Sequence, residues 1–228
     1  MLQLVWGLFV LLLLTGACAV LASGGRVHGA LLPLPLLAGS ALLLYGFGIA
    51  GALRIGAALV VLLLAALWVV GLVKLRPAGF AQACRDTVTN PGIALFLGGA
   101  VFLWVLFFVL QPMFTQWDEF TAWGLAPKMV VERGAFYVAD PVNLKASFTY
   151  PATSLITFLF QPFGVWSEWA CLAALDTLAL ACVAAATALP RQRWYSAVLI
   201  FAAGVLLPYF FRDPVPGAYA TQYVNAMA

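Results

Sequence analysis

The chain has 228 residues, of which 65% are hydrophobic and 8% are charged, against about 45–50% and about 25% in ordinary soluble domains. This composition excludes a water-soluble globular domain, because so few charged side chains cannot cover its surface. The formal net charge of +3 is also too small for electrostatic binding to nucleic acid. We therefore expect an all-α, polytopic helical membrane protein, since helices satisfy their own backbone hydrogen bonds within the lipid bilayer.

Six apolar runs are long enough to cross a bilayer as helices, which takes about 20 residues each. They cover residues 2–21, 28–51, 55–73, 92–110, 169–189 and 194–211. Pro33 and Pro35 lie near the start of the second run and predict a helix that begins late or bends there. A further stretch at 151–165 reaches only about 22 Å as a helix, and Pro162 interrupts it. We expect this stretch to lie at the membrane interface without crossing.

Basic residues orient the spans, since Lys and Arg concentrate in short cytoplasmic loops. The clearest basic loop is 74–90, and placing it in the cytoplasm puts loop 111–150 on the extracytoplasmic side. If 151–165 does not cross, Arg191 and Arg193 also become cytoplasmic, which agrees with the same rule. We therefore expect about six transmembrane helices, plus juxtamembrane helices in the long extracytoplasmic loop.

Loop 111–150 breaks the apolar pattern by mixing aromatic and charged residues. Its charged residues are Asp118, Glu119, Lys128, Glu132, Arg133, Asp140 and Lys145. Such a mixture suits the headgroup layer, where aromatic rings anchor and charges stay in water. We expect a short helix that begins near Pro127 and ends at Gly134. The adjacent acids Asp118 and Glu119 either serve one site, with one of them dominant, or only favour the N-terminus of an interfacial helix.

The same loop carries short motifs that together resemble the first extracytoplasmic loop of the GT-C membrane glycosyltransferases. They are Trp117-Asp118-Glu119-Phe120, Trp123-Gly124, Lys128, Gly134 and Tyr150-Pro151. The types resembled are the bacterial aminoarabinose transferases and the protein O-mannosyltransferases of glycosyltransferase family thirty-nine. These enzymes carry an acidic residue or an Asp-Glu pair in this loop. A second acidic position follows two spans later, where this chain has Asp213.

The resemblance divides the chain into an N-terminal three-span region, 1–90, and a GT-C-like membrane region, 91–228. The first region is an addition, because such enzymes usually place the acidic loop after their first span. They also usually continue with more spans than this chain has after its second acidic position. The resemblance therefore implies either a complete enzyme or the N-terminal portion of one.

Resemblance also implies the chemistry, which is transfer of a sugar from a polyprenyl-phosphate-linked donor to a hydroxyl of a glycan, lipid or protein acceptor. The reaction would take place on the extracytoplasmic face of a bacterial inner membrane. Asp118 is then the candidate general base, which removes the proton of the acceptor hydroxyl, and Glu119 is the second candidate.

The leaving phosphate gains negative charge and needs cations or a metal ion nearby. The substrate-binding residues expected on the same side of the membrane are Lys128, Lys145, Tyr150, Arg212 and Asp213. Asp213 would orient the acceptor or help to bind a divalent cation. Whether a divalent cation is required stays open, because two carboxylates from distant loops form no recognisable metal motif.

Asp176 lies near the middle of the 169–189 run, where an ionised group is costly and usually functional. Two roles are compatible with Asp176: a proton relay in a transporter or flippase, and a structural hydrogen bond between helices. A third reading is a non-catalytic membrane scaffold, in which the aromatic and charged cluster of loop 111–150 only anchors the chain at the interface.

Overall fold

The computed structural model is all-α and describes residues 1–25, 27–114, 124–136, 151–188 and 194–210, with side chains as far as residue 204. Its elements are α1 (Leu2–Ser23), η1 (Gly29–Leu31), α2 (Pro33–Ile49), α3 (Leu53–Thr89), α4 (Pro91–Leu110), α5 (Leu125–Arg133), α6 (Pro151–Phe160), α7 (Glu168–Ala186) and α8 (Trp194–Phe210). No strand occurs among these described residues.

Five helices are long and apolar enough to cross a membrane, namely α1, η1 with α2, α3, α4 and α7. Their length and composition mark the chain as an integral membrane protein. Helix α8, expected as a sixth span, is a shorter apolar helix of 17 residues. The late start of the second span is confirmed, because η1 precedes it and Pro33 occupies the first turn of α2, where the missing N–H costs least.

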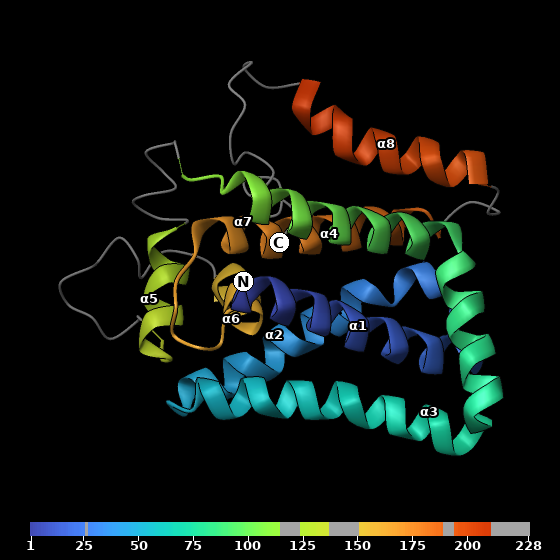
Figure 1. The fold of residues 1–228 in the computed structure, drawn as a ribbon, viewed down its shortest axis with the longest axis horizontal. Helices are drawn as coiled ribbons and strands as arrows, with labels where there is room; N and C mark the ends of the chain where they lie inside the picture. Colours follow the sequence, from blue (N-terminus) through green and yellow to red (C-terminus); the bar gives the residue numbers. More distant parts are fainter. Residues whose placement is uncertain (26, 115–123, 137–150, 189–193, 211–228) are drawn as a thin grey trace.

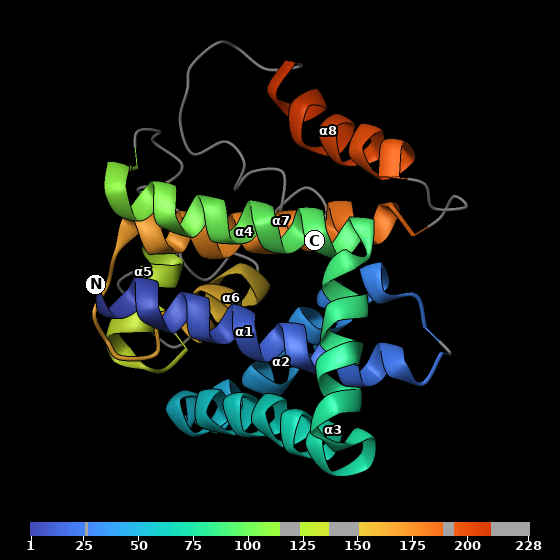
Figure 2. The same cartoon turned by 45° about the vertical axis from the view of Figure 1, so that its right-hand side comes forward.

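The spans run side by side, and two shorter helical segments cross their opposite ends (Figures 1 and 2). Helix α5 stands across one end. The second part of α3, residues 77–89, stands across the other end and leads into α4. Both segments lie at the ends of the spans, where the membrane surfaces would be, and both run across the spans. This placement is typical of interfacial helices.

The segment 74–90, expected as a loop, is helical in the structure. Helix α3 continues to Thr89 but turns sharply at Arg76, whose φ of 59° and ψ of 162° are not helical. Pro77 begins the second part, a position where a missing N–H is tolerated. The Phe80 ring then packs edge-on against Trp68 of the spanning part, with ring centroids 5.3 Å apart. This contact holds the second part against the bundle.

The core of the bundle depends on close pairs of helices. Helix α1 packs most extensively on α3, and α4 on α7. At the first pair, Gly16 leaves room for Trp68, whose Nε1 donates to the Leu13 carbonyl at 3.1 Å. At the second, fully buried Trp104 donates from Nε1 to Thr177 Oγ1 at 3.1 Å. Small residues and buried polar pairs of this kind are what hold membrane helices together.

Helix α6 is shorter than the spans, as expected, and it is enclosed by other helices, whereas its place at the membrane interface stays a prediction. All residues of α6 from Thr153 to Phe160 are buried, and the helix packs against α5, α2, α7 and α1. A turn at Gly164, with φ of 74°, then returns the chain to α7. The neighbouring helices keep the polar side chains of α6 away from lipid, where polar groups without hydrogen bonds are costly.

Candidate functional site

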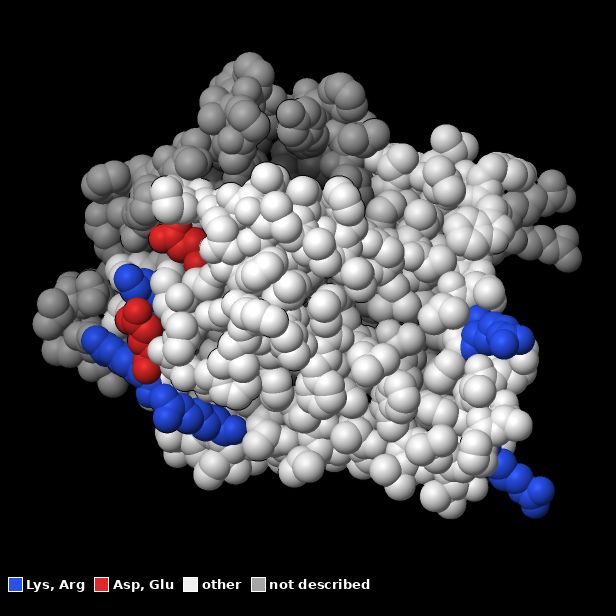
Figure 3. All heavy atoms as spheres, viewed as in Figure 1, with Lys and Arg blue, Asp and Glu red and all other residues white. Residues whose placement is uncertain are grey.

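On the face drawn in Figure 3, the charged side chains of the described residues lie at the two ends of the bundle, with an apolar band between them. One end, here called the basic end, holds Lys74, Arg76, Arg85 and Asp86. The opposite end, here called the α5 end, holds Arg54, Lys128, Glu132, Arg133 and Glu168. This separation suits a bilayer, whose apolar core excludes charged side chains. Sites open to water therefore belong to the two ends.

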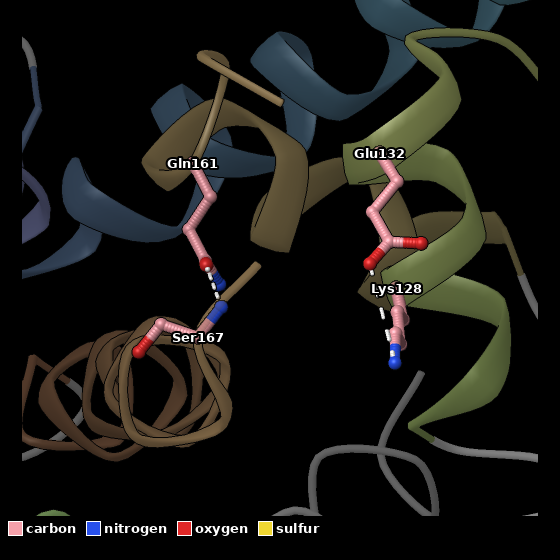
Figure 4. Close-up of polar contacts among 4 residues, drawn as sticks. All are labelled: Lys128, Glu132, Gln161 and Ser167. Atoms are coloured by element: carbon pink, nitrogen blue, oxygen red, sulfur yellow. Dashed lines mark hydrogen bonds and ion pairs between the residues drawn. The ribbon is translucent and has the colours of Figure 1, made fainter. Parts of the chain in front are cut away.

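Helix α5 lies across its end with an apolar face toward the bundle. Ala126, Met129 and Val130 are buried, whereas Lys128 is exposed. Lys128 Nζ lies 4.0 Å from Glu132 Oε1, and both side chains are about half exposed (Figure 4). An exposed ion pair of this kind is weak. The Lys128 ammonium therefore stays accessible to an anionic group at the α5 end.

Lys128 is the one predicted site residue that the structure describes. The others, Asp118, Glu119, Lys145, Tyr150, Arg212 and Asp213, lie outside the described residues. The short helix expected between Pro127 and Gly134 is confirmed as α5, although it begins at Leu125 and ends at Arg133. Gly134 caps it with φ of 65°, a left-handed conformation that glycine adopts without strain.

Arg54 is a second cation at the α5 end, and sequence reasoning did not include it in the site. It lies in the first turn of α3 and reaches the end of α5 and the turn after α6. An ideal Cβ on Gly134 would lie 2.8 Å from Arg54 Nε, and one on Gly164 would lie 3.4 Å from a terminal guanidinium nitrogen. The C-terminus of a helix favours a nearby cation. A lone Arg at the start of a span is typical of simple snorkelling, so its sequence position gives no sign of these contacts.

Glu168 ties the beginning of loop 111–150 to the bundle. It occupies the first turn of α7, and its Oε2 accepts the Phe114 N–H at 2.8 Å. Phe114 also packs near Trp166, with ring centroids 6.1 Å apart. Glu168 therefore has a positioning role beyond that of an acid favoured by the helix N-terminus, and loop 111–150 starts beside α7.

Polar side chains of α6 line the interior of the α5 end. Thr153 and Thr157 lie four residues apart on one face of α6, and Gln161 follows directly after the helix. All three are buried together with Ser154. Thr157 Oγ1 lies 3.6 Å from Cys171 Sγ of α7. Buried polar groups are costly inside a membrane bundle unless they are hydrogen-bonded. Their gathering here marks the α5 end as the polar part of the interior.

Three polar atoms of this region are buried without a hydrogen-bond partner. They are Ser154 Oγ, Gln161 Nε2 and Ser167 Oγ. The Gln161 side chain points toward α7, where its Oε1 accepts the Ser167 N–H at 2.9 Å (Figure 4). That bond fixes the orientation of the amide and leaves its N–H₂ donors unused. Buried unpaired groups of this kind call for an explanation, such as a ligand that pairs with them.

Asp176 lies deeper, eight residues after Glu168 in α7 or about 12 Å along the helix axis. It is 7% exposed, and its Oδ1 is buried without a hydrogen-bond partner. Helix α7 is the most enclosed span, with 78% of its most apolar stretch buried. Asp176 therefore faces the bundle interior, where the cost of placing a carboxyl group against lipid is avoided.

The described residues form no metal centre, since no three His, Cys, Asp or Glu side chains among them are grouped to hold an ion. The carboxylates considered for a divalent cation lie in the parts of the chain outside this description. The cations on described elements of the α5 end are Arg54, Lys128 and Arg133.

Comparison with known proteins gives no match: no family model, curated protein or solved structure is similar to this chain. Function is therefore inferred from its own residues. The strongest indication is the α5 end, where α5, the start of loop 111–150, and unpaired polar atoms of α6 and α7 come together.

Proposed function

We propose that the chain is a membrane glycosyltransferase, or the N-terminal portion of one, with its active site at the α5 end. It would transfer a sugar from a polyprenyl-phosphate-linked donor to a hydroxyl of a glycan, lipid or protein acceptor. The polyprenyl chain of such a donor lies in the bilayer and its phosphate at the surface. A site at the end of a helix bundle suits both parts, and we place it on the extracytoplasmic face of a bacterial inner membrane.

The proposed reaction is a single displacement that inverts the anomeric carbon. The acceptor oxygen forms a bond to this carbon while the bond from carbon to the phosphate oxygen breaks. The electron pair of that bond leaves with the polyprenyl phosphate. Asp118 takes the proton of the acceptor hydroxyl, with Glu119 as the second candidate. Cations stabilise the departing phosphate, and Lys128 and Arg54 lie at the proposed end.

The observation that carries this proposal is the set of unpaired polar atoms at the α5 end. Ser154 Oγ, Gln161 Nε2 and Ser167 Oγ are buried and unpaired, close to the point where Glu168 holds Phe114. Sugar hydroxyls and phosphate oxygens are the groups that such donors and acceptors recognise. The loop that carries Asp118 begins near Glu168, since Phe114 donates to that residue, and this start supports placing the active site at the α5 end.

The direct test replaces Asp118 by Asn and measures sugar transfer. Full-length protein in proteoliposomes is given labelled polyprenyl-phosphate mannose, glucose or aminoarabinose in separate reactions, and the release of polyprenyl phosphate is followed. The wild type should release it from one of the three donors. Loss of the base should lower the rate by about 10²–10⁴-fold.

Asp140→Asn is the matched control, because it removes a carboxylate from the same loop without touching the proposed base. It should leave the rate within about twofold, because the proposed reaction gives Asp140 no part. Full transfer by Asp118→Asn would remove Asp118 from the mechanism. No release from any donor by the wild type would count against the glycosyltransferase itself and favour the transporter or the scaffold.

Asp176 favours a second candidate function, proton-coupled transport. Its buried, unpaired Oδ1 in the most enclosed span is the kind of group that relays protons in membrane proteins. Proteoliposomes loaded with a pH-sensitive dye would report proton flux driven by an imposed membrane potential. Flux that disappears in Asp176→Asn and persists in Asp118→Asn would support transport, and absence of flux in the wild type would exclude it.

A further inference from the structure

The corner between α6 and α7 holds an amide whose donors have no acceptor. Gln161 directly follows α6 and is 1% exposed. Its Oε1 accepts the Ser167 N–H at 2.9 Å (Figure 4). A backbone N–H can only donate, so this bond decides which end of the amide is the oxygen. Nε2 is the other end, with two N–H donors, and it is buried without a hydrogen-bond partner.

Two hydroxyls of the same region are unpaired as well. Ser154 precedes Gln161 by seven residues, about two helical turns, and its Oγ is buried without a partner. Ser167 is the N-cap of α7, but its side chain makes no capping bond, and its Oγ is also unpaired. The first N–H groups of a helix have no partner within the helix, so the Ser167 hydroxyl leaves them unsatisfied. The corner therefore offers several neutral groups that an oxygen-rich ligand would satisfy.

The corner lies just beneath the surface of the α5 end. Phe163 and Val165 belong to the turn between Gln161 and Ser167, and they are 46% and 57% exposed. Gly164 lies between them with φ of 74°, a conformation that favours glycine. A ligand needs the corner to open, because its polar atoms are enclosed in this structure. Movement of this short turn would open it without displacing a span.

A cation lies beside the same turn. Arg54 is exposed, and one of its terminal guanidinium nitrogens lies 3.4 Å from an ideal Cβ on Gly164. Guanidinium groups bind phosphate through paired hydrogen bonds, and in a polyprenyl-phosphate-linked donor the phosphate is attached directly to the sugar. A phosphate at Arg54 would therefore place the sugar at this turn, where the neutral groups pair with its hydroxyls. The corner itself suits the phosphate less, because the Glu168 carboxylate lies in the first turn of α7.

We propose that Gln161 is a specificity-determining residue of the glycosyltransferase, and that its amide donates to one hydroxyl of the donor sugar. This inference rests on the proposed function and divides its site in two. The corner between α6 and α7 binds the sugar, and Arg54 binds the phosphate. Gln161 takes no part in forming or breaking bonds. It favours a sugar that carries an oxygen at one position of the ring.

The test compares whichever of the mannose, glucose and aminoarabinose donors the wild type uses with analogues whose sugar lacks one hydroxyl at a time. Full-length protein in proteoliposomes is given each donor, and kcat/KM is measured from the release of polyprenyl phosphate. One deoxy donor should react with the wild type about tenfold more slowly than its parent, as for the loss of one hydrogen bond.

The same pair of donors is then given to Gln161→Met, whose side chain is similar in length but has no N–H donors. The preference for the parent donor should disappear in this variant. Gln161→Ala is measured beside it, so that the comparison does not depend on the folding of one variant. The ratio of the two kcat/KM values separates recognition from a general loss of stability, which would slow both donors equally.

Gln3→Met is the matched control. Gln3 belongs to α1, and its Nε2 makes an exposed contact with the same turn by donating to the Val165 carbonyl at 3.3 Å. This variant should keep the wild-type preference. The inference is overturned if the wild type treats all deoxy donors alike, or if every preference persists in the Gln161 variants. In both cases transfer continues and the proposed function stands, whereas no release from any donor by the wild type would overturn both.

Discussion

Each end of the bundle is covered by a short helix that crosses the spans, but the two covers lie over different interiors. Under α5 the interior is polar, with Gln161 and Ser154 buried among helices. Under the second part of α3 the contact is apolar, because Phe80 packs on Trp68, and the polar groups line a cavity beside it. An interfacial helix alone therefore says little about function. The groups that the helix covers decide which end is the candidate active site.

The largest effects are expected from two matched glycine substitutions, one at each end of the bundle. A Cβ on Gly48 would overlap the Phe136 ring beside α5, and one on Gly71 would overlap the Phe80 ring and Val20. Gly48→Val and Gly71→Val should each lower the free energy of unfolding by about 1–3 kcal/mol through overpacking. Thermal unfolding in detergent micelles would measure both.

The two variants should differ in function. Gly48→Val displaces the Phe136 ring at the α5 end and should reduce sugar transfer. Gly71→Val displaces Phe80 at the opposite end and should leave transfer within about twofold. An equal loss of transfer in both variants would show that the two ends are not independent.

The next largest loss of stability is expected when Glu168 is replaced by Ala. In Glu168→Ala, the Phe114 N–H loses the carboxylate that accepts it at 2.8 Å, which should cost about 1–2 kcal/mol. Loop 111–150 should become more accessible to limited proteolysis at the same time. A protease-resistant loop in Glu168→Ala would show that Glu168 does not position it.

Arg76→Gly should stabilise the protein. Arg76 has φ of 59° and ψ of 162°, a region that is nearly exclusive to glycine and costs other residues about 1–3 kcal/mol. Replacement should raise the unfolding free energy by about 1 kcal/mol, seen as a higher midpoint in thermal unfolding. A lower midpoint would mean that the Arg76 side chain contributes more than the backbone strain costs.

The smallest effect is expected for the exposed ion pair on α5. Glu132→Ala breaks a 4.0 Å contact between half-exposed side chains and should change the unfolding free energy by about 0–0.5 kcal/mol. The same thermal unfolding assay measures it, in low salt and in high salt. A larger loss in low salt would show that Glu132 belongs to a wider network of charges.

Much of the fold follows from the sequence, because a spanning helix needs a run of apolar residues of a certain length. The spans and α5 are predictable for this reason, with Pro127 and Gly134 marking the latter. The turn at Arg76 is not predictable, since Pro77 ends a loop as readily as it begins a helix. The resulting packing of Phe80 on Trp68 depends on contacts between distant residues.

The candidate site is less predictable than the fold. The composition of α6 does not tell whether the helix lies at the interface or inside the bundle. Only the four-residue spacing of Thr153, Thr157 and Gln161 indicates a polar face along this apolar stretch. Arg54 carries no local motif. Its place beside Gly134 and Gly164 arises from the way α3, α5 and α6 meet, which periodicity does not encode.

The central claim is that the buried polar atoms of the α5 end serve a substrate and not the fold. Ser154→Ala tests it most directly, because Ser154 Oγ is buried and unpaired. Removal of an unpaired hydroxyl should leave the unfolding free energy unchanged or raise it by up to about 1 kcal/mol. We expect transfer of the sugar to fall by about tenfold in the same protein, as for the loss of one hydrogen bond to a substrate. A variant that is less stable but transfers at the wild-type rate would contradict the claim.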